Sequence, residues 1–219
     1  MSQTRESLRL ARQQHVTVAT TPNPARPARC RLLFCIVILL PATASAHTET
    51  GAIGGLVSGF SHPLTGLDHM VAMVAVGLWG AFLGGRAIWM LPVAFPVVMA
   101  FGGALGVLGV PIPAIETGIA ISGVVLGLMV AFAVKPPIWL AALIVGLFGM
   151  FHGHAHGTEL PESANALAYS AGFVISTGLL HLSGIALGLL VHWPWGRIAV
   201  RCGGFAIAAV GLGFLFNIL

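Results

Sequence analysis

Two short polar stretches interrupt an otherwise apolar chain, and both are made of residues that bind metal ions. Motif 1 reads His62-Pro-Leu-Thr-Gly-Leu-Asp68-His69, and motif 2 reads Phe151-His152-Gly-His154-Ala-His156-Gly-Thr-Glu159. Imidazole and carboxylate together suit a borderline divalent cation such as Ni²⁺, Co²⁺ or Zn²⁺. Neither motif contains a cysteine, which argues against a copper(I) site or a structural zinc site. The two motifs therefore predict a site for a divalent metal ion.

Motif 1 has the spacing of one helical face. Residues seven apart differ by only about 20° around a helix, so His62 and His69 share a face if Pro63 lies in the first turn, where proline is tolerated. Asp68 adjoins that face. It is either a ligand itself or the carboxylate that orients a neighbouring imidazole.

Motif 2 is also typical of a helix. His152 and His156 are four residues apart and therefore neighbours on one face, and Glu159 follows one turn later. His154 points nearly opposite and is the weaker candidate. His181 and His192 stand alone in apolar surroundings, and we interpret them as hydrogen-bonding residues between helices.

The composition is that of a membrane protein. Of the 219 residues, 57% are hydrophobic and 7% are charged, against about 25% charged residues in a soluble domain. An ionisable side chain at the centre of a bilayer costs about 2.5 kcal/mol or more, so the two motifs mark a functional site. The basic residues concentrate before residue 32, and the rest of the chain is nearly balanced in charge. Neither a nucleic-acid partner nor a nucleotide-binding loop is indicated.

The amino-terminal segment has the parts of a secretory signal. Basic Arg29-Cys-Arg31 precedes nine apolar residues, 32–40, and small residues follow up to Ala46. We expect residues 1–46 to be a cleaved signal peptide with an atypically long amino-terminal extension, or with a start codon further downstream. Residues 47–219 would form the membrane-embedded transporter domain. Cleavage would leave His47 at the new terminus, where its amine and imidazole could chelate a metal ion together.

The mature chain is predicted to be an all-α polytopic membrane helix bundle. Apolar stretches predict about six transmembrane helices, at about 65–84, 87–109, 114–134, 138–156, 164–191 and 197–218. The apolar residues 50–61 add a short amino-terminal half-helix or extend the first span. The loops are short, so we expect successive helices to be antiparallel neighbours.

Charge placement predicts the orientation of these helices. With six spans after a cleaved signal, the basic residues of the mature chain fall on one side of the membrane and the acidic residues near span ends fall on the other. The basic residues are Arg86, Lys135, Arg197 and Arg201, and the acidic residues are Glu49, Glu116, Glu159 and Glu162. The positive-inside rule places the basic side in the cytoplasm of a bacterium, with both termini periplasmic. Both motifs then face the periplasm and could meet in one site.

With these motifs the chain resembles the HupE/UreJ family of bacterial nickel/cobalt permeases. The resemblance covers about residues 47–218 and rests on the residues quoted above for both motifs. It implies uptake of Ni²⁺ or Co²⁺ across the inner membrane, as transported substrate and with no resident cofactor, and a functional link to hydrogenase or urease maturation. The metal-binding residues that it implies are His62, Asp68, His69, His152 and His156, together with His47 and Glu159.

A membrane di-iron hydroxylase or desaturase is the alternative function, because His152-x-His154-x-His156 superficially suits its histidine boxes. Such boxes are denser and face the cytoplasm, whereas these motifs face outward by the charge rule. The residues do not decide between facilitated diffusion and proton coupling, rank the metals, or decide whether the chain forms a homo-oligomer.

Overall fold

A computed structural model of the chain describes residues 51–160 and 165–219. The predicted signal peptide, its cleavage site after Ala46 and the candidate ligand His47 lie outside the described residues. The predictions about them stay predictions.

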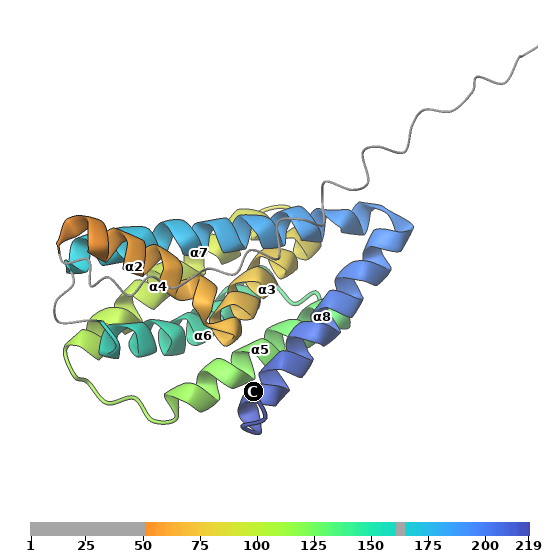
Figure 1. The fold of residues 1–219 in the computed structure, drawn as a ribbon. Helices are drawn as coiled ribbons and strands as arrows, with labels where there is room; N and C mark the ends of the chain where they lie inside the picture. The colour runs from red at the N-terminus through yellow and green to blue at the C-terminus, as the bar shows by residue number, and fades with distance from the viewer. Residues whose placement is uncertain (1–50, 161–164) are drawn as a thin grey trace, which may run out of the picture. The chain divides into compact units, whose positions relative to one another are not determined.

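Every regular element in the described ranges is a helix, which confirms the all-α class (Figure 1). There are seven α-helices and one short 3-10 helix in these ranges. They are α2 (Ala52–Thr65), α3 (Leu67–Leu83), α4 (Ala87–Val107), α5 (Ile115–Ala131), α6 (Ile138–Thr158), α7 (Ala166–Gly188), η1 (Leu189–His192) and α8 (Pro194–Leu215). The helix α2 corresponds to the predicted half-helix, and the other α-helices correspond to the six predicted spans.

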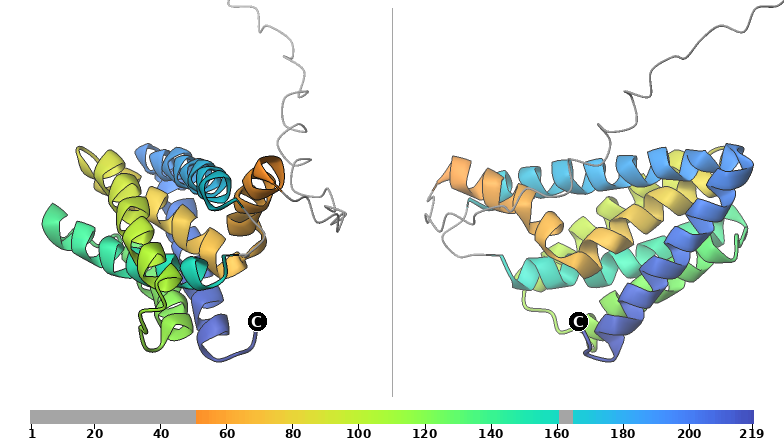
Figure 2. Two further views of the ribbon diagram at one scale, coloured as in Figure 1. Left: turned by 90° about the vertical axis from the view of Figure 1, so that its left-hand side faces the viewer. Right: turned by 45° about the vertical axis from the view of Figure 1, so that its right-hand side comes forward.

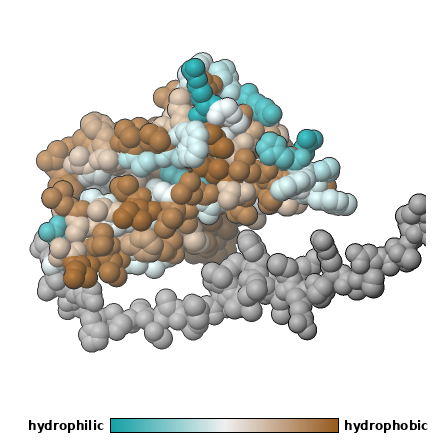
Figure 3. All heavy atoms as spheres, turned by 90° about the horizontal axis from the view of Figure 1, so that it is seen from above, coloured by the Kyte–Doolittle hydropathy of each residue, from teal (hydrophilic) through white to brown (hydrophobic). Residues whose placement is uncertain are grey.

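Several of these helices are long and apolar enough to cross a membrane. Four pass on length and hydropathy, namely α4, α6, α7 with η1, and α8, and the bent pair α2–α3 raises the number to five. The apolar helix α5 has 17 residues and is shorter. Hydrophobic side chains cover most of the described face shown in Figure 3. The chain is a multi-pass membrane protein by these measures, whereas the number of six spans stays a prediction.

The chain bends sharply between α2 and α3, inside motif 1. The two helices meet at 81° around Gly66, whose φ of −85° and ψ of 107° are extended. The prediction of one helix through motif 1, with Pro63 in its first turn, is therefore wrong, because Pro63 lies in the last turn of α2. Proline and glycine close together destabilise a continuous helix, and the helix restarts at Leu67 with Asp68 in its first turn.

The helix α3 lies at the centre of the bundle. Its residues Met73, Val76 and Trp79 are fully buried, and it packs against α4, α5, α7 and α8. The Trp79 indole donates a hydrogen bond to the main-chain carbonyl of Val134, 3.0 Å away, just after α5. The element that carries Asp68 and His69 at its start is thus held from several sides.

The largest helix interfaces join helices that are not consecutive in the chain. They pair α4 with α6, α5 with α8, and α2 with α7, and the last two pairs can be followed in Figures 1 and 2. The prediction that successive helices would be neighbours holds for α3 with α4 and for α5 with α6, but α4 with α5 and α6 with α7 are not among the packed pairs of the described residues. Glycines explain which helices pair most closely. A Cβ at Gly153 would overlap the carbonyl of Met99 on α4, and one at Gly172 would overlap the carbonyl of Leu56 on α2. Lipid supplies no hydrophobic drive between helices, so close backbone approach determines which of them pair.

Basic residues of two separate segments gather near one end of α3 and α5. The Lys135 ammonium lies 5.0 Å from the centre of the Phe82 ring, near the end of α3. The Arg201 Nε donates to the carbonyl of Ala131, at the end of α5, over 2.7 Å. Motif 1 lies at the opposite end of α3.

Candidate metal site

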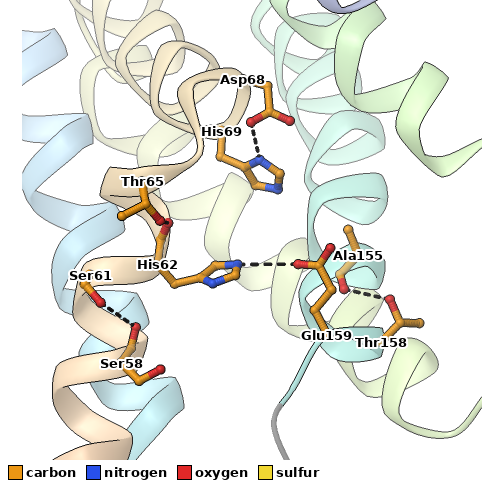
Figure 4. Close-up of polar contacts among 9 residues, drawn as sticks. All are labelled: Ser58, Ser61, His62, Thr65, Asp68, His69, Ala155, Thr158 and Glu159. Carbon is orange, nitrogen blue, oxygen red and sulfur yellow. Dashed lines mark hydrogen bonds and ion pairs between the residues drawn. The ribbon is translucent and has the colours of Figure 1, made fainter. Parts of the chain in front are cut away.

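The bundle brings motifs 1 and 2 together. The His156 ring, on α6, lies 4.9 Å from the His62 ring on α2 and 4.4 Å from the His69 ring on α3, measured between ring centres. Figure 4 shows His62 pointing across from α2 toward Glu159 at the end of α6. We call His62, His69, His152 and His156 with Glu159 the histidine cluster. Its members come from three helices, and the 81° bend lets His62 and His69 reach it from different helix axes.

Three members of this cluster are close to a ligand geometry. One ligand atom each of His62, His156 and Glu159 lies within 4.8 Å of the others, and His62 Nε2 is 3.5 Å from Glu159 Oε2. Two ligands that each lie about 2.1 Å from a metal ion are at most about 4.2 Å apart. A contraction of about 0.6 Å or more is therefore needed. The Glu159 side chain, which is 54% exposed, has room to rotate.

Asp68 orients His69. Its Oδ1 lies 2.8 Å from His69 Nδ1, and an ionised carboxylate only accepts hydrogen bonds, so Nδ1 carries the proton. His69 Nε2 is then a bare lone pair, buried and without a hydrogen-bond partner in the described residues. Of the two roles left open for Asp68, this geometry matches the carboxylate that fixes the tautomer of a ligand histidine.

His152 is prepared in the same way by a residue that the sequence analysis missed. Ser122 on α5 donates its hydroxyl proton to the carbonyl of Ile119 over 2.6 Å, so its oxygen accepts from His152 Nε2, 2.9 Å away. His152 Nδ1 is left as a buried lone pair with no partner in residues 51–160 and 165–219. The His152 ring is fully buried and 4.8 Å from that of His69.

His154 does not join the cluster. Its Nε2 lies 2.7 Å from the main-chain carbonyl of Val110, in the loop after α4. A carbonyl only accepts, so the ring donates there and supports the loop. The interpretation of His154 as the weaker candidate agrees with this placement.

A polar pocket of about 300 Å³ opens beside the cluster. It is lined by His62, Thr65, Gly66, Asp68, His69, Glu116, Ala155 and Glu159. Glu116, in the first turn of α5, is an acidic residue near a span end in the sequence, where it could help to attract a cation. Three carboxylates around one pocket make it attractive to a cation.

The structure thus places six of the seven candidate ligands in one region. These are His62, Asp68, His69, His152, His156 and Glu159, and His47 lies outside the described residues. The residue that the sequence analysis missed, Ser122, is an ordinary helix residue by pattern. Only its proximity to His152 in space distinguishes it.

Comparisons with known proteins match nearly the whole described chain. The family model described as HupE / UreJ protein matches residues 35–214. A curated relative, "Protein HupE" of Rhizobium leguminosarum bv. viciae, is 48% identical over 178 residues, which are 81% of this chain and 93% of the relative. No solved structure matches the chain. On the extent of the family match and the identity to this relative, the chain is a member of the HupE/UreJ family.

Proposed function

We propose that the protein is an inner-membrane transporter that takes up a divalent transition metal ion, Ni²⁺ with Co²⁺ as a second substrate, through the histidine cluster. The observation that carries the proposal is the convergence of His62, His156 and Glu159, with ligand atoms within 4.8 Å of one another. This convergence occurs inside a bundle of apolar helices. The family to which the chain belongs is linked to nickel and cobalt transport.

The protonation of the cluster supports metal binding. A metal ion needs an unprotonated nitrogen on each imidazole. Asp68 and Ser122 take up one ring N–H each, which leaves His69 Nε2 and His152 Nδ1 free to bind. A buried polar atom with no partner in the described residues costs about 1–3 kcal/mol, and a bound ion would offset that cost. Nitrogen and carboxylate ligands suit Ni²⁺ and Co²⁺.

The proposed topology has six spans, with the cluster and both termini on the periplasmic side. The bent pair α2–α3 would be the first span, and the shorter α5 the third. The gathering of Lys135 and Arg201 near one end of α3 and α5, away from Glu116 and Glu159, supports a cytoplasmic basic end. A cation would then enter through the polar pocket from the periplasm.

The alternative of a di-iron enzyme is less well supported. It draws on the run His152-x-His154-x-His156, in which all three imidazoles would be ligands. In the structure, His154 donates to the Val110 carbonyl instead of facing the other two. The family is moreover a transporter family.

Uptake of radiolabelled nickel and cobalt tests the proposal, in cells that lack other importers and with zinc as a competitor. We expect saturable uptake of nickel that cobalt inhibits, and cells carrying the empty vector are the control. Bound iron detected by spectroscopy, together with oxidation of a lipid substrate and no metal uptake, would favour the enzyme instead.

A further inference from the structure

Another imidazole with a free ring nitrogen, like those of His69 and His152, lies deeper in the bundle and apart from the two motifs. His181 on α7 is only 2% exposed, and its ring centre is 5.6 Å from that of Phe95 on α4. The same Phe95 ring, which is fully buried, lies 5.4 Å from the His152 ring. Phe95 therefore contacts both the innermost histidine of the cluster and His181.

His181 is held by a carbonyl that α4 leaves free. Pro96 has no N–H, so the carbonyl of Pro92, four residues earlier, has no donor within its own helix. The Pro92 carbonyl lies close enough to the His181 imidazole to accept a hydrogen bond from it, and neighbouring helices make such contacts in membranes when proline frees a backbone group. This contact agrees with the interpretation of His181 as a hydrogen-bonding residue between helices. It leaves Nε2 buried and without a partner in the described residues.

Two hydroxyl groups accompany His181 on α7. Ser176 and Thr177 are fully buried, and neither hydroxyl has a partner in the described ranges. Thr177 precedes His181 by four residues and is its neighbour on the helix surface, whereas Ser176 faces a different side of α7. Serine and threonine in a helix commonly donate to the carbonyl three or four residues earlier, as Ser122 and Ser183 do here. Helix packing alone does not explain why the hydroxyls of Ser176 and Thr177 lack such a bond.

We propose that His181, with the hydroxyl of Thr177, forms an inner binding position for the transported metal ion. The ion would pass to it from His152, on the other side of Phe95. This inference rests on the proposed function. One imidazole with a neutral oxygen binds a divalent ion more weakly than the histidine cluster does, and a transported ion needs an inner position that it can leave.

The main test uses His181→Asn, because the Asn side-chain NH₂ can stand where His Nδ1–H stands and donate to the Pro92 carbonyl, while Nε2 is removed. The matched control is His192→Asn, at the exposed 3-10 helix. Nickel binding is measured by equilibrium dialysis of the purified full chain, and nickel uptake is measured in proteoliposomes. We expect His181→Asn to bind nickel at the histidine cluster with unchanged affinity and to take it up about tenfold more slowly or worse. His192→Asn should match the wild type in both.

Three results would overturn the inner position. Uptake by His181→Asn within about twofold of the wild type would show that His181 contacts Pro92 but does not bind the transported ion. Loss of nickel binding together with uptake would indicate a general structural role. If the wild type itself neither binds nor transports nickel or cobalt, the proposed function fails and takes this inference with it.

A second variant detects the ion at position 181 directly and covers the case in which His181→Asn does not accumulate. His181→Cys is made with Cys30, Cys35 and Cys202 replaced by serine, and His192→Cys in the same background is the control. With Co²⁺ we expect thiolate-to-cobalt charge-transfer absorption for His181→Cys only. No such band at saturating Co²⁺, with the histidine cluster occupied, would contradict the inner position.

Discussion

Two cavities of the described structure differ in size and in chemistry, and the smaller of them has the chemistry of a metal site. The polar pocket measures about 300 Å³ and is bordered by His62, His69 and three carboxylates. A groove of about 510 Å³ between α4, α6 and α7 is lined almost entirely by apolar residues such as Met99, Val107 and Phe173. His156 lines the groove and also belongs to the histidine cluster. The contrast teaches that donor atoms, and not volume, identify the site.

The largest expected effect compares the same substitution at two histidines of motif 2. We expect His156→Gln to abolish nickel uptake, because it removes a ligand from the histidine cluster. His154→Gln should keep most of the uptake, because an amide NH₂ near the position of Nε2 can still donate to the Val110 carbonyl. Uptake is measured in cells with the amount of protein in the membrane as a control. Equal losses in both variants would contradict the division of roles.

A smaller effect is expected where the ligand stays and only its orientation is weakened. Asp68→Asn keeps an oxygen near His69 Nδ1 but removes the charge that fixes the tautomer. Outer partners of this kind typically contribute 10–100-fold, so nickel affinity should fall by about tenfold. Equilibrium dialysis with the purified protein measures it. Complete loss of binding would instead show that Asp68 is itself a ligand.

Helix packing beneath the groove can be perturbed without touching a ligand. A Cβ at Gly153 would overlap the Met99 carbonyl, so Gly153→Ala should separate α4 from α6 and destabilise the protein by about 1–3 kcal/mol. The matched control is Gly178→Ala on α7, where a Cβ would meet nothing within 4 Å. The melting temperature in detergent measures the effect. If both variants melt like the wild type, the close approach does not determine the pairing.

The smallest effect is expected in the groove itself. Ala104→Phe adds a large apolar side chain at an exposed position of the groove wall on α4. Nickel uptake should stay within about twofold of the wild type, because the proposed ion path runs through the polar pocket and not through the groove. Uptake relative to the amount of protein is again the measurement. A loss as large as that of His156→Gln would show that the ion passes through the groove.

Much of the site could be predicted from sequence because histidine and carboxylate are rare in apolar helices. The spacing of His152, His156 and Glu159 predicted one helical face, and α6 has that arrangement. Motif 1 was harder to interpret. Its seven-residue spacing suggested a continuous helix, whereas His62 and His69 meet across a bend at Gly66. The sequence pattern predicted that these residues lie close together, but it did not predict that the backbone bends between them.

The helix boundaries could also be predicted well, but the helix partners could not. Apolar length defines a span, and charged, glycine and proline residues mark its ends. Which helices pair depends on where glycines allow two backbones to approach, and Gly149, Gly153 and Gly157 recur on α6 at spacing four without naming a partner. Ser122 was not recognised as a site residue for the same reason. Its role depends on His152, which is 30 positions away in the chain.

The bend at Gly66 allows a small rotation of α2 to move His62 relative to the rest of the histidine cluster. His62 lies four residues before Gly66, which is about 6 Å along the axis of α2. Around that pivot, α2 acts as a short lever arm, and a rotation of about 6° moves the end of the arm by about 0.6 Å. That displacement is of the same size as the smallest contraction, about 0.6 Å, that an ion would require of the widest separation in the cluster. A small rotation of α2 therefore changes the distances from His62 to His156 and Glu159 while the core of α3 stays in place.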